Sequence, residues 1–130
     1  MLLHQPKILL LIGGFGAIGV LMRFCIDELL LRYSNHPFPI ATFIINCMGS
    51  LCIGVIYVIG IEKEIISLSY RYALMVGLLG GFTTFSTYTF QVIMMVEKKH
   101  FNPAMIYLVV SPLVGILLCY FGIAVSRCIL

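Results

Sequence analysis

The sequence predicts an all-α membrane protein with four transmembrane helices, and composition and the placement of charge are the observations behind this prediction. Of its 130 residues, 62% are hydrophobic and only 10% are charged, whereas an ordinary soluble domain carries about 25% charged residues. So few charges cannot cover a water-facing surface, which excludes a soluble globular enzyme. The same hydrophobicity excludes a disordered chain. An integral membrane protein is the class that fits.

The uncharged runs between short clusters of charge define the predicted spans. These runs cover residues 8–22, 33–61, 72–96 and 101–126. The last three exceed the length of about 20 apolar residues that a helix needs to cross a bilayer. The first reaches it as residues 8–26 if Arg23 extends its charge towards the headgroups. A signal peptide is the alternative for this run, but no small-residue cleavage motif follows it. We therefore predict one domain, residues 1–130, with spans at 8–26, 38–61, 72–96 and 103–126.

The Lys and Arg count on each side of the membrane leaves the orientation open. With four spans, both termini and the middle loop lie on one side, which has Lys7, Lys63, Arg71 and Arg127. The opposite side has Arg23, Arg32, Lys98 and Lys99. Cytoplasmic loops carry an excess of Lys and Arg, so an even balance specifies no orientation. Either one early charge decides, or the chain inserts both ways and pairs as an antiparallel, dual-topology dimer, which we favour.

Polar residues of the second span fall on one helix face. Thr42, Gly49 and Ser50 each lie three or four positions from Asn46, the spacing of one helix face. Asn46 brings two N–H donors and one acceptor into the membrane. Such a side chain is either an interhelical hydrogen bond that holds the bundle together or part of a polar pathway.

The third span is the most informative one. Gly80 and Gly81 are followed by five Thr or Ser residues within residues 83–89, and we predict that this helix is broken at mid-membrane. Breaks of this kind occur where the freed carbonyls meet a partner, a cavity or an ion. Aromatic or amide side chains recur every third position at Phe82, Phe85, Tyr88 and Gln91. Core aromatics with hydroxyls bonded to their own helix are the alternative, and we favour a permeation or binding segment.

No carboxylate lies in the middle of any predicted span. A proton-coupled antiporter needs a titratable group there, and a cation channel built on an acidic ring needs several. Neutral hydrogen-bond donors and the positive edges of aromatic rings both favour an anion. We therefore predict that the chain carries a small anion that forms strong hydrogen bonds. A small multidrug-resistance-type dual-topology exporter is the alternative transporter, although it needs an intramembrane glutamate. A bundle that packs without transporting is the other alternative.

Three sequence motifs together resemble the Fluc/CrcB family of fluoride channels. Residues 16–24, GAIGVLMRF, resemble its first-helix signature G-x-x-G-A-x-x-R-Y. Ala41-Thr42 with Asn46 resembles its G-T-x-x-x-N segment. Residues 80–87, GGFTTFST, resemble its highly specific core G-G-x-T-T-F-S-T. The motifs occur in order and cover three of the four helices.

The resemblance implies a channel, not an enzyme, that exports cytoplasmic fluoride passively through the plasma (inner) membrane and reduces fluoride toxicity. It implies an antiparallel homodimer with two fluoride pathways and a structural Na⁺ at its centre, held by the backbone carbonyls of Gly80 and Thr83. The expected pathway residues are Asn46, Thr42, Phe85, Tyr88 and Ser111, with Phe82, Ser86 and Thr87 beside them. The other residues that match family motifs are Arg23, Gly81 and Thr84.

Two departures from the family pattern bear on the pathway. Tyr88 stands where the family has phenylalanine, which keeps the ring and adds a hydroxyl. Gln91 stands where many members have glutamate. Because some members pair two divergent chains, these departures keep a heterodimer with a paralogous chain open, whereas the even charge balance favours the homodimer.

Overall fold

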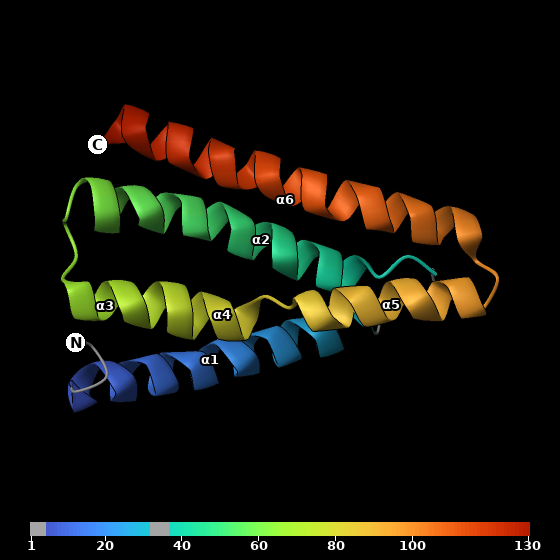
Figure 1. The fold of residues 1–130 in the computed structure, drawn as a ribbon, viewed down its shortest axis with the longest axis horizontal. Coiled ribbons are helices and arrows are strands. Elements are labelled where there is room, and N and C mark those ends of the chain that lie inside the picture. The colour runs from blue at the N-terminus through green and yellow to red at the C-terminus, as the bar shows by residue number, and fades with distance from the viewer. Residues whose placement is uncertain (1–4, 32–36) are drawn as a thin grey trace.

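The computed structural model describes residues 5–31 and 37–130, and that part of the chain is helical with short connections. Four of its helices are long and apolar enough to cross a membrane, which confirms the predicted number of spans. The chain is thus a multi-pass membrane protein. Arg32, which entered the charge count, lies outside the described residues. The first span begins and the last one ends at the same end of the bundle (Figure 1).

Prolines mark the beginnings of the first two spans. Helix α1 (Pro6–Leu31) begins at a proline, a residue favoured at the first helical position because the amide there has no helical partner. Helix α2 (Ile40–Tyr57) directly follows Pro39. It continues without a gap into a π-helical turn, Val58–Glu62, so the second span is longer than its α-helical part.

The third span is assembled from several helical pieces. These are α3 (Leu68–Tyr72), a π-helical segment (Ala73–Leu78), α4 (Leu79–Phe82) and α5 (Phe85–Glu97). Helix α5 ends where Lys99 takes a left-handed φ of 62°. There the His100 amide donates to the Met95 carbonyl and the Lys99 amide to the Val96 carbonyl, both at 2.9 Å. This pair of backbone hydrogen bonds is a common way for a helix to end. The chain turns here, and α6 (Phe101–Ile129) follows.

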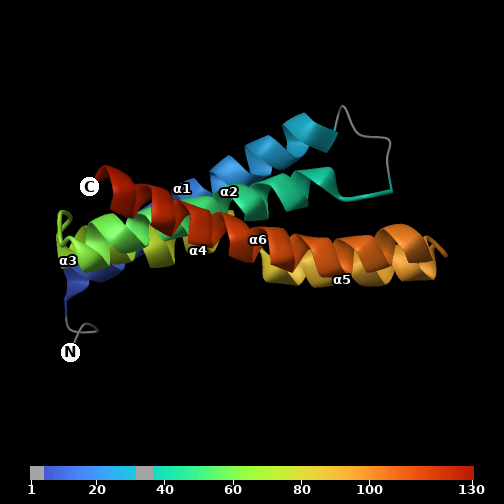
Figure 2. The same ribbon diagram turned by 90° about the horizontal axis from the view of Figure 1, so that it is seen from above.

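Small residues bring the helices close together in two pairs. Helix α1 lies along the first half of the third span, and α2 lies between the third span and α6 (Figure 1). A Cβ added at Gly77 would lie 2.6 Å from the Ile12 carbonyl oxygen of α1, and one at Gly122 would lie 2.5 Å from the Leu51 carbonyl oxygen of α2. Close backbone approach at small residues is the usual packing of membrane helices. Figure 2 shows α5 and α6 side by side at the end of the bundle that lies opposite the C-terminus.

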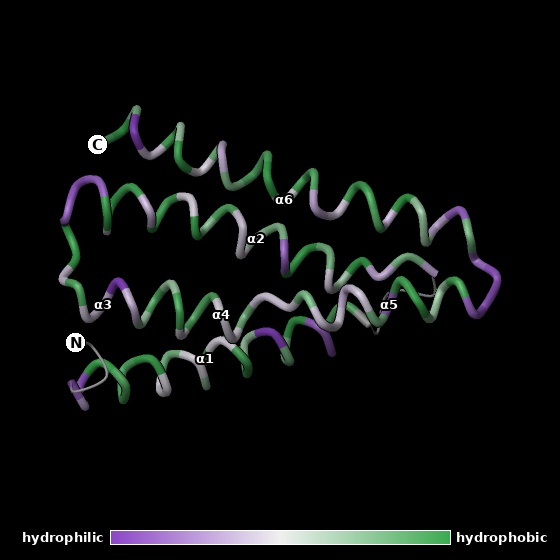
Figure 3. The backbone as a smooth tube through the Cα atoms, in the orientation of Figure 1, coloured by the Kyte–Doolittle hydropathy of each residue, from purple (hydrophilic) through white to green (hydrophobic). Residues whose placement is uncertain are grey.

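Apolar surface faces outwards over most of the bundle, as expected in lipid. Hydrophilic residues gather at the turns and ends of the helices (Figure 3). A cluster of buried residues lies between α5 and α6, and it consists of Tyr88, Val92, Met95, Ala104 and Tyr107. At the end of the bundle where α6 ends, Arg127 forms an ion pair with Glu62 that ties α6 to the end of the second span.

Candidate functional site

The backbone of the third span is extended at two residues, between α4 and α5. Thr83 has φ −85° and ψ 157°, and Thr84 has φ −148° and ψ 114°. The Thr84 side chain caps the new helix because its Oγ1 accepts from the Thr87 amide at 3.2 Å. Threonine is a favoured residue at this capping position. The hydroxyl of Thr83 instead donates back to the Leu79 carbonyl at 2.9 Å, as threonines inside helices often do.

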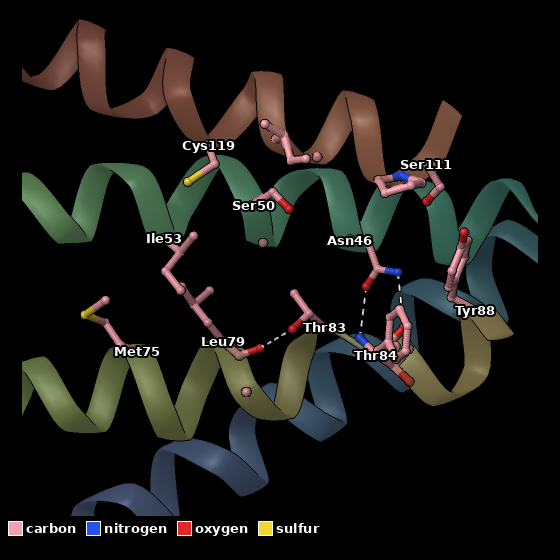
Figure 4. Close-up of a pocket in the computed structure, with 16 residues that line it drawn as sticks. Asn46, Ser50, Ile53, Met75, Leu79, Thr83, Thr84, Tyr88, Ser111 and Cys119 are labelled. Carbon is pink, nitrogen blue, oxygen red and sulfur yellow. Dashed lines mark hydrogen bonds between the residues drawn. The ribbon is translucent and has the colours of Figure 1, made fainter. Parts of the chain in front are cut away.

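Asn46 of α2 bonds to both backbone groups of Thr84. Its Oδ1 accepts from the Thr84 amide at 2.9 Å, and its Nδ2 donates to the Thr84 carbonyl at 3.2 Å (Figure 4). In a continuous helix the Thr84 amide would donate to the Gly80 carbonyl four residues earlier. The side chain of Asn46 thus replaces a helical bond with an interhelical one. One N–H of its amide is not engaged by these two bonds.

Arg23 of α1 contacts the same part of the third span from the other side. Its Nε donates to the Gly81 carbonyl at 3.3 Å, and the side chain is half-buried. Glycine allows this approach, because a Cβ at Gly81 would lie 2.5 Å from the Gly16 carbonyl oxygen of α1. The carbonyls of the last turn of a helix have no helical donor, and a cation near that end is favourable. The structure therefore gives Arg23 a partner that the sequence did not indicate.

A cavity of about 480 Å³ lies where α2, the third span and α6 meet. Its polar lining comes from Asn46, Ser50, Thr83, Thr84, Tyr88 and Ser111 (Figure 4). Its apolar lining comes from Gly49, Ile53, Met75, Leu79, Gly80, Phe85, Pro112, Gly115, Ile116 and Cys119. No Asp, Glu, Lys or Arg is among these residues. This lining offers an ion hydrogen-bond donors, carbonyl oxygens and ring edges.

The structure brings several of the predicted pathway residues together on this cavity. Asn46, Ser111, Phe85 and Tyr88 all line it, from three different spans. The Phe85 and Tyr88 rings are 5.6 Å apart. They differ sharply in exposure, because Phe85 is 77% exposed on the described chain and Tyr88 only 7%. Gly80 and Thr83, whose carbonyls are the predicted ligands of Na⁺, lie on the same cavity.

Other predicted residues lie away from the cavity lining. Phe82 is buried. Ser86 and Thr87 belong to the first turn of α5, where the Thr87 hydroxyl accepts from Thr84 Oγ1 at 2.9 Å. Thr42 is buried, and its hydroxyl accepts a hydrogen bond from Gln91. The roles predicted for all of these residues stay predictions.

Thr42 belongs to a second polar cluster, together with Gln91 and Tyr107. The Gln91 Nε2 donates to Thr42 Oγ1 at 2.8 Å, and the Tyr107 hydroxyl donates to Gln91 Oε1 at 3.0 Å. Sequence reasoning did not single out Tyr107. The signal that would have found it is its position one helical turn before Ser111, on the same face of the fourth span.

Comparison with known proteins identifies relatives over nearly the whole chain. Residues 10–123 match a family described as CrcB-like protein, Camphor Resistance (CrcB). A protein of Hydrogenovibrio crunogenus (strain DSM 25203 / XCL-2) named fluoride-specific ion channel FluC is 34% identical over 88% of this chain and 87% of its own length. One of the same name from Methylobacillus flagellatus (strain ATCC 51484 / DSM 6875 / VKM B-1610 / KT) is 37% identical over 87% of this chain and 89% of its own length. The chain belongs to the CrcB-like protein (Camphor Resistance, CrcB) family.

Proposed function

We propose that the chain is the subunit of a fluoride-selective channel that releases cytoplasmic fluoride passively. The observation that carries this proposal is the identity of 34–37%, over nearly nine tenths of the chain, to relatives named fluoride-specific ion channels. The cavity supports it independently. Its lining is uncharged and offers hydrogen-bond donors and aromatic edges, which suit a small anion that accepts strong hydrogen bonds.

Export needs no energy source other than the membrane potential. Hydrogen fluoride crosses membranes as a neutral acid and ionises in the more alkaline cytoplasm, where the anion is trapped. A channel lets the anion leave down an inside-negative potential, which is worth about 2.3 kcal/mol per charge for each 100 mV. In a bacterium the membrane in question is the plasma membrane. The expected consequence is resistance to fluoride.

The proposed assembly is an antiparallel, dual-topology homodimer in which a second copy covers the cavity. Two observations support it. Gly80 and Phe85 line the cavity, yet both are exposed on the described chain. The Lys and Arg count is also the same for both sides of the membrane. A pairing with a divergent chain is the competing assembly, and a subunit that is monomeric and inactive until a second chain is added would favour it.

Gly80 of α4 and Thr83, the first extended residue, fit the Na⁺ that the family resemblance implies. Hard cations take oxygen ligands, and Gly80 and Thr83 would supply backbone carbonyls. The amide that would pair with the Gly80 carbonyl in a continuous helix donates instead to Asn46. No atom comes within 4 Å of a Cβ built at Gly80, so this face is open to a partner. Two carbonyls are too few for a cation, so a second copy would have to supply the others. Bound there, the ion would be structural.

The test is fluoride efflux from proteoliposomes that contain the purified chain, with chloride efflux measured in parallel. Fluoride should pass and chloride should pass poorly. Phe85→Ile should lower the fluoride flux while the assembly stays intact. Phe90→Ile is the matched control, because Phe90 is also an exposed α5 phenylalanine, 64% exposed, but lies off the cavity. Equal fluoride and chloride fluxes would refute selectivity, and equal effects of the two variants would remove Phe85 from the pathway.

A further inference from the structure

Pro112 leaves one backbone carbonyl of α6 without its helical donor. Each amide of an α-helix donates to the carbonyl four residues earlier, and proline has no amide hydrogen. Pro112 lies inside α6, so the carbonyl that loses its donor is that of Leu108. An unpaired carbonyl is costly in the hydrocarbon region, and prolines are tolerated in membrane helices where another group pairs with it.

The hydroxyl of Tyr88 supplies the missing donor from the neighbouring helix. It donates to the Leu108 carbonyl oxygen at 2.7 Å, and the Tyr88 side chain is buried. The Tyr88 ring lies 5.6 Å from the Phe85 ring and 5.0 Å from the Tyr107 ring, measured between centroids. Both Tyr88 and Pro112 line the cavity, so this bond joins its α5 wall to its α6 wall.

We propose that Tyr88 is a positioning residue of the cavity, whose hydroxyl bonds to the carbonyl that Pro112 leaves unpaired and thereby fixes the ring beside Phe85. A phenolic hydroxyl has one proton to donate, and here that proton goes to Leu108. Tyr88 therefore presents to an anion only the edge of its ring, as phenylalanine would. The effect on ion passage rests on the proposed function, whereas the bond between α5 and α6 does not.

A double-mutant cycle between Tyr88→Phe and Pro112→Ala tests the proposal. Tyr88→Phe alone should lower both the fluoride flux and the thermal unfolding midpoint of the purified protein, the flux by roughly two- to tenfold, which is the range for one hydrogen bond. Alanine at position 112 returns an amide donor to the Leu108 carbonyl. In the Pro112→Ala background, the same tyrosine substitution should therefore change the flux by less than about twofold.

Tyr107→Phe is the matched control for this cycle. It also removes a buried tyrosine hydroxyl, but that hydroxyl donates to Gln91, so its loss should have the same effect with and without Pro112→Ala. Equal effects of Tyr88→Phe in both backgrounds would overturn the proposal. A lowered unfolding midpoint with unchanged flux and unchanged fluoride-to-chloride ratio would overturn it too, because the bond would then be structural only. A wild-type protein that passes no fluoride would refute the proposed function instead, and the unfolding midpoints would still show whether Tyr88 and Pro112 are coupled.

Discussion

Replacing Asn46 by leucine removes two hydrogen bonds from the extended backbone between α4 and α5. The substitution keeps a side chain of similar size on α2 but leaves the amide and the carbonyl of Thr84 without the partners that lie at 2.9 and 3.2 Å. No alternative helical bond is at hand for the amide, because the extended conformation of Thr83 and Thr84 takes it away from the helix. We expect the geometry of this segment to relax.

The size of the effect follows from these two groups. A buried polar group that loses its partner costs about 1–3 kcal/mol, and interhelical bonds in membranes average about 0.6 kcal/mol. Asn46 and Thr84 are half-buried, so water can pair with part of what is lost, and we expect about 2–3 kcal/mol for both groups together. Because 1.4 kcal/mol is tenfold, this shifts the equilibrium between the native and the relaxed segment roughly 30- to 150-fold.

Thermal unfolding in detergent and fluoride efflux from proteoliposomes measure this loss. Asn46→Leu should lower the unfolding midpoint and reduce the flux at least about tenfold. Ser50→Ala is the control, since Ser50 lies one turn further along α2 on the same cavity and makes neither of these bonds. If the flux of Asn46→Leu stays within twofold of wild type with an unchanged midpoint, Asn46 does not hold the segment.

Two further predictions concern the other contacts of this segment. Gly81→Ala should destabilise the protein by about 1–3 kcal/mol in thermal unfolding, because its Cβ would lie 2.5 Å from the Gly16 carbonyl oxygen. Gly80→Ala is the control and should leave the subunit fold intact, because a Cβ built at Gly80 meets no atom within 4 Å. Equal destabilisation by the two would contradict this packing. Arg23→Gln should reduce the fluoride flux more than Arg71→Gln. Each arginine donates to a backbone carbonyl at 3.3 Å, but of the two only Arg23 donates to α4. Equal fluxes would show that the Gly81 carbonyl needs no cation.

The predicted site residues separate into those that share a helix face and those that depend on a neighbouring helix. Asn46 and Ser50 could be grouped from their spacing on α2, and both line the cavity. Thr42 has the same spacing, yet it bonds to Gln91 of α5. Spacing along one helix says which residues share a face. It does not say which residue of another helix lies opposite.

The sequence by itself determined the membrane class and the four spans, because the bilayer thickness sets the length of an apolar helix and the cost of charge sets where it ends. Only the tertiary structure decided that Asn46 bonds to Thr84, that Arg23 bonds to Gly81 and that Tyr88 bonds to Leu108. These partners are 20 to 58 positions apart. They meet because the helices pack at small residues, whose contacts decide which backbone groups come within reach.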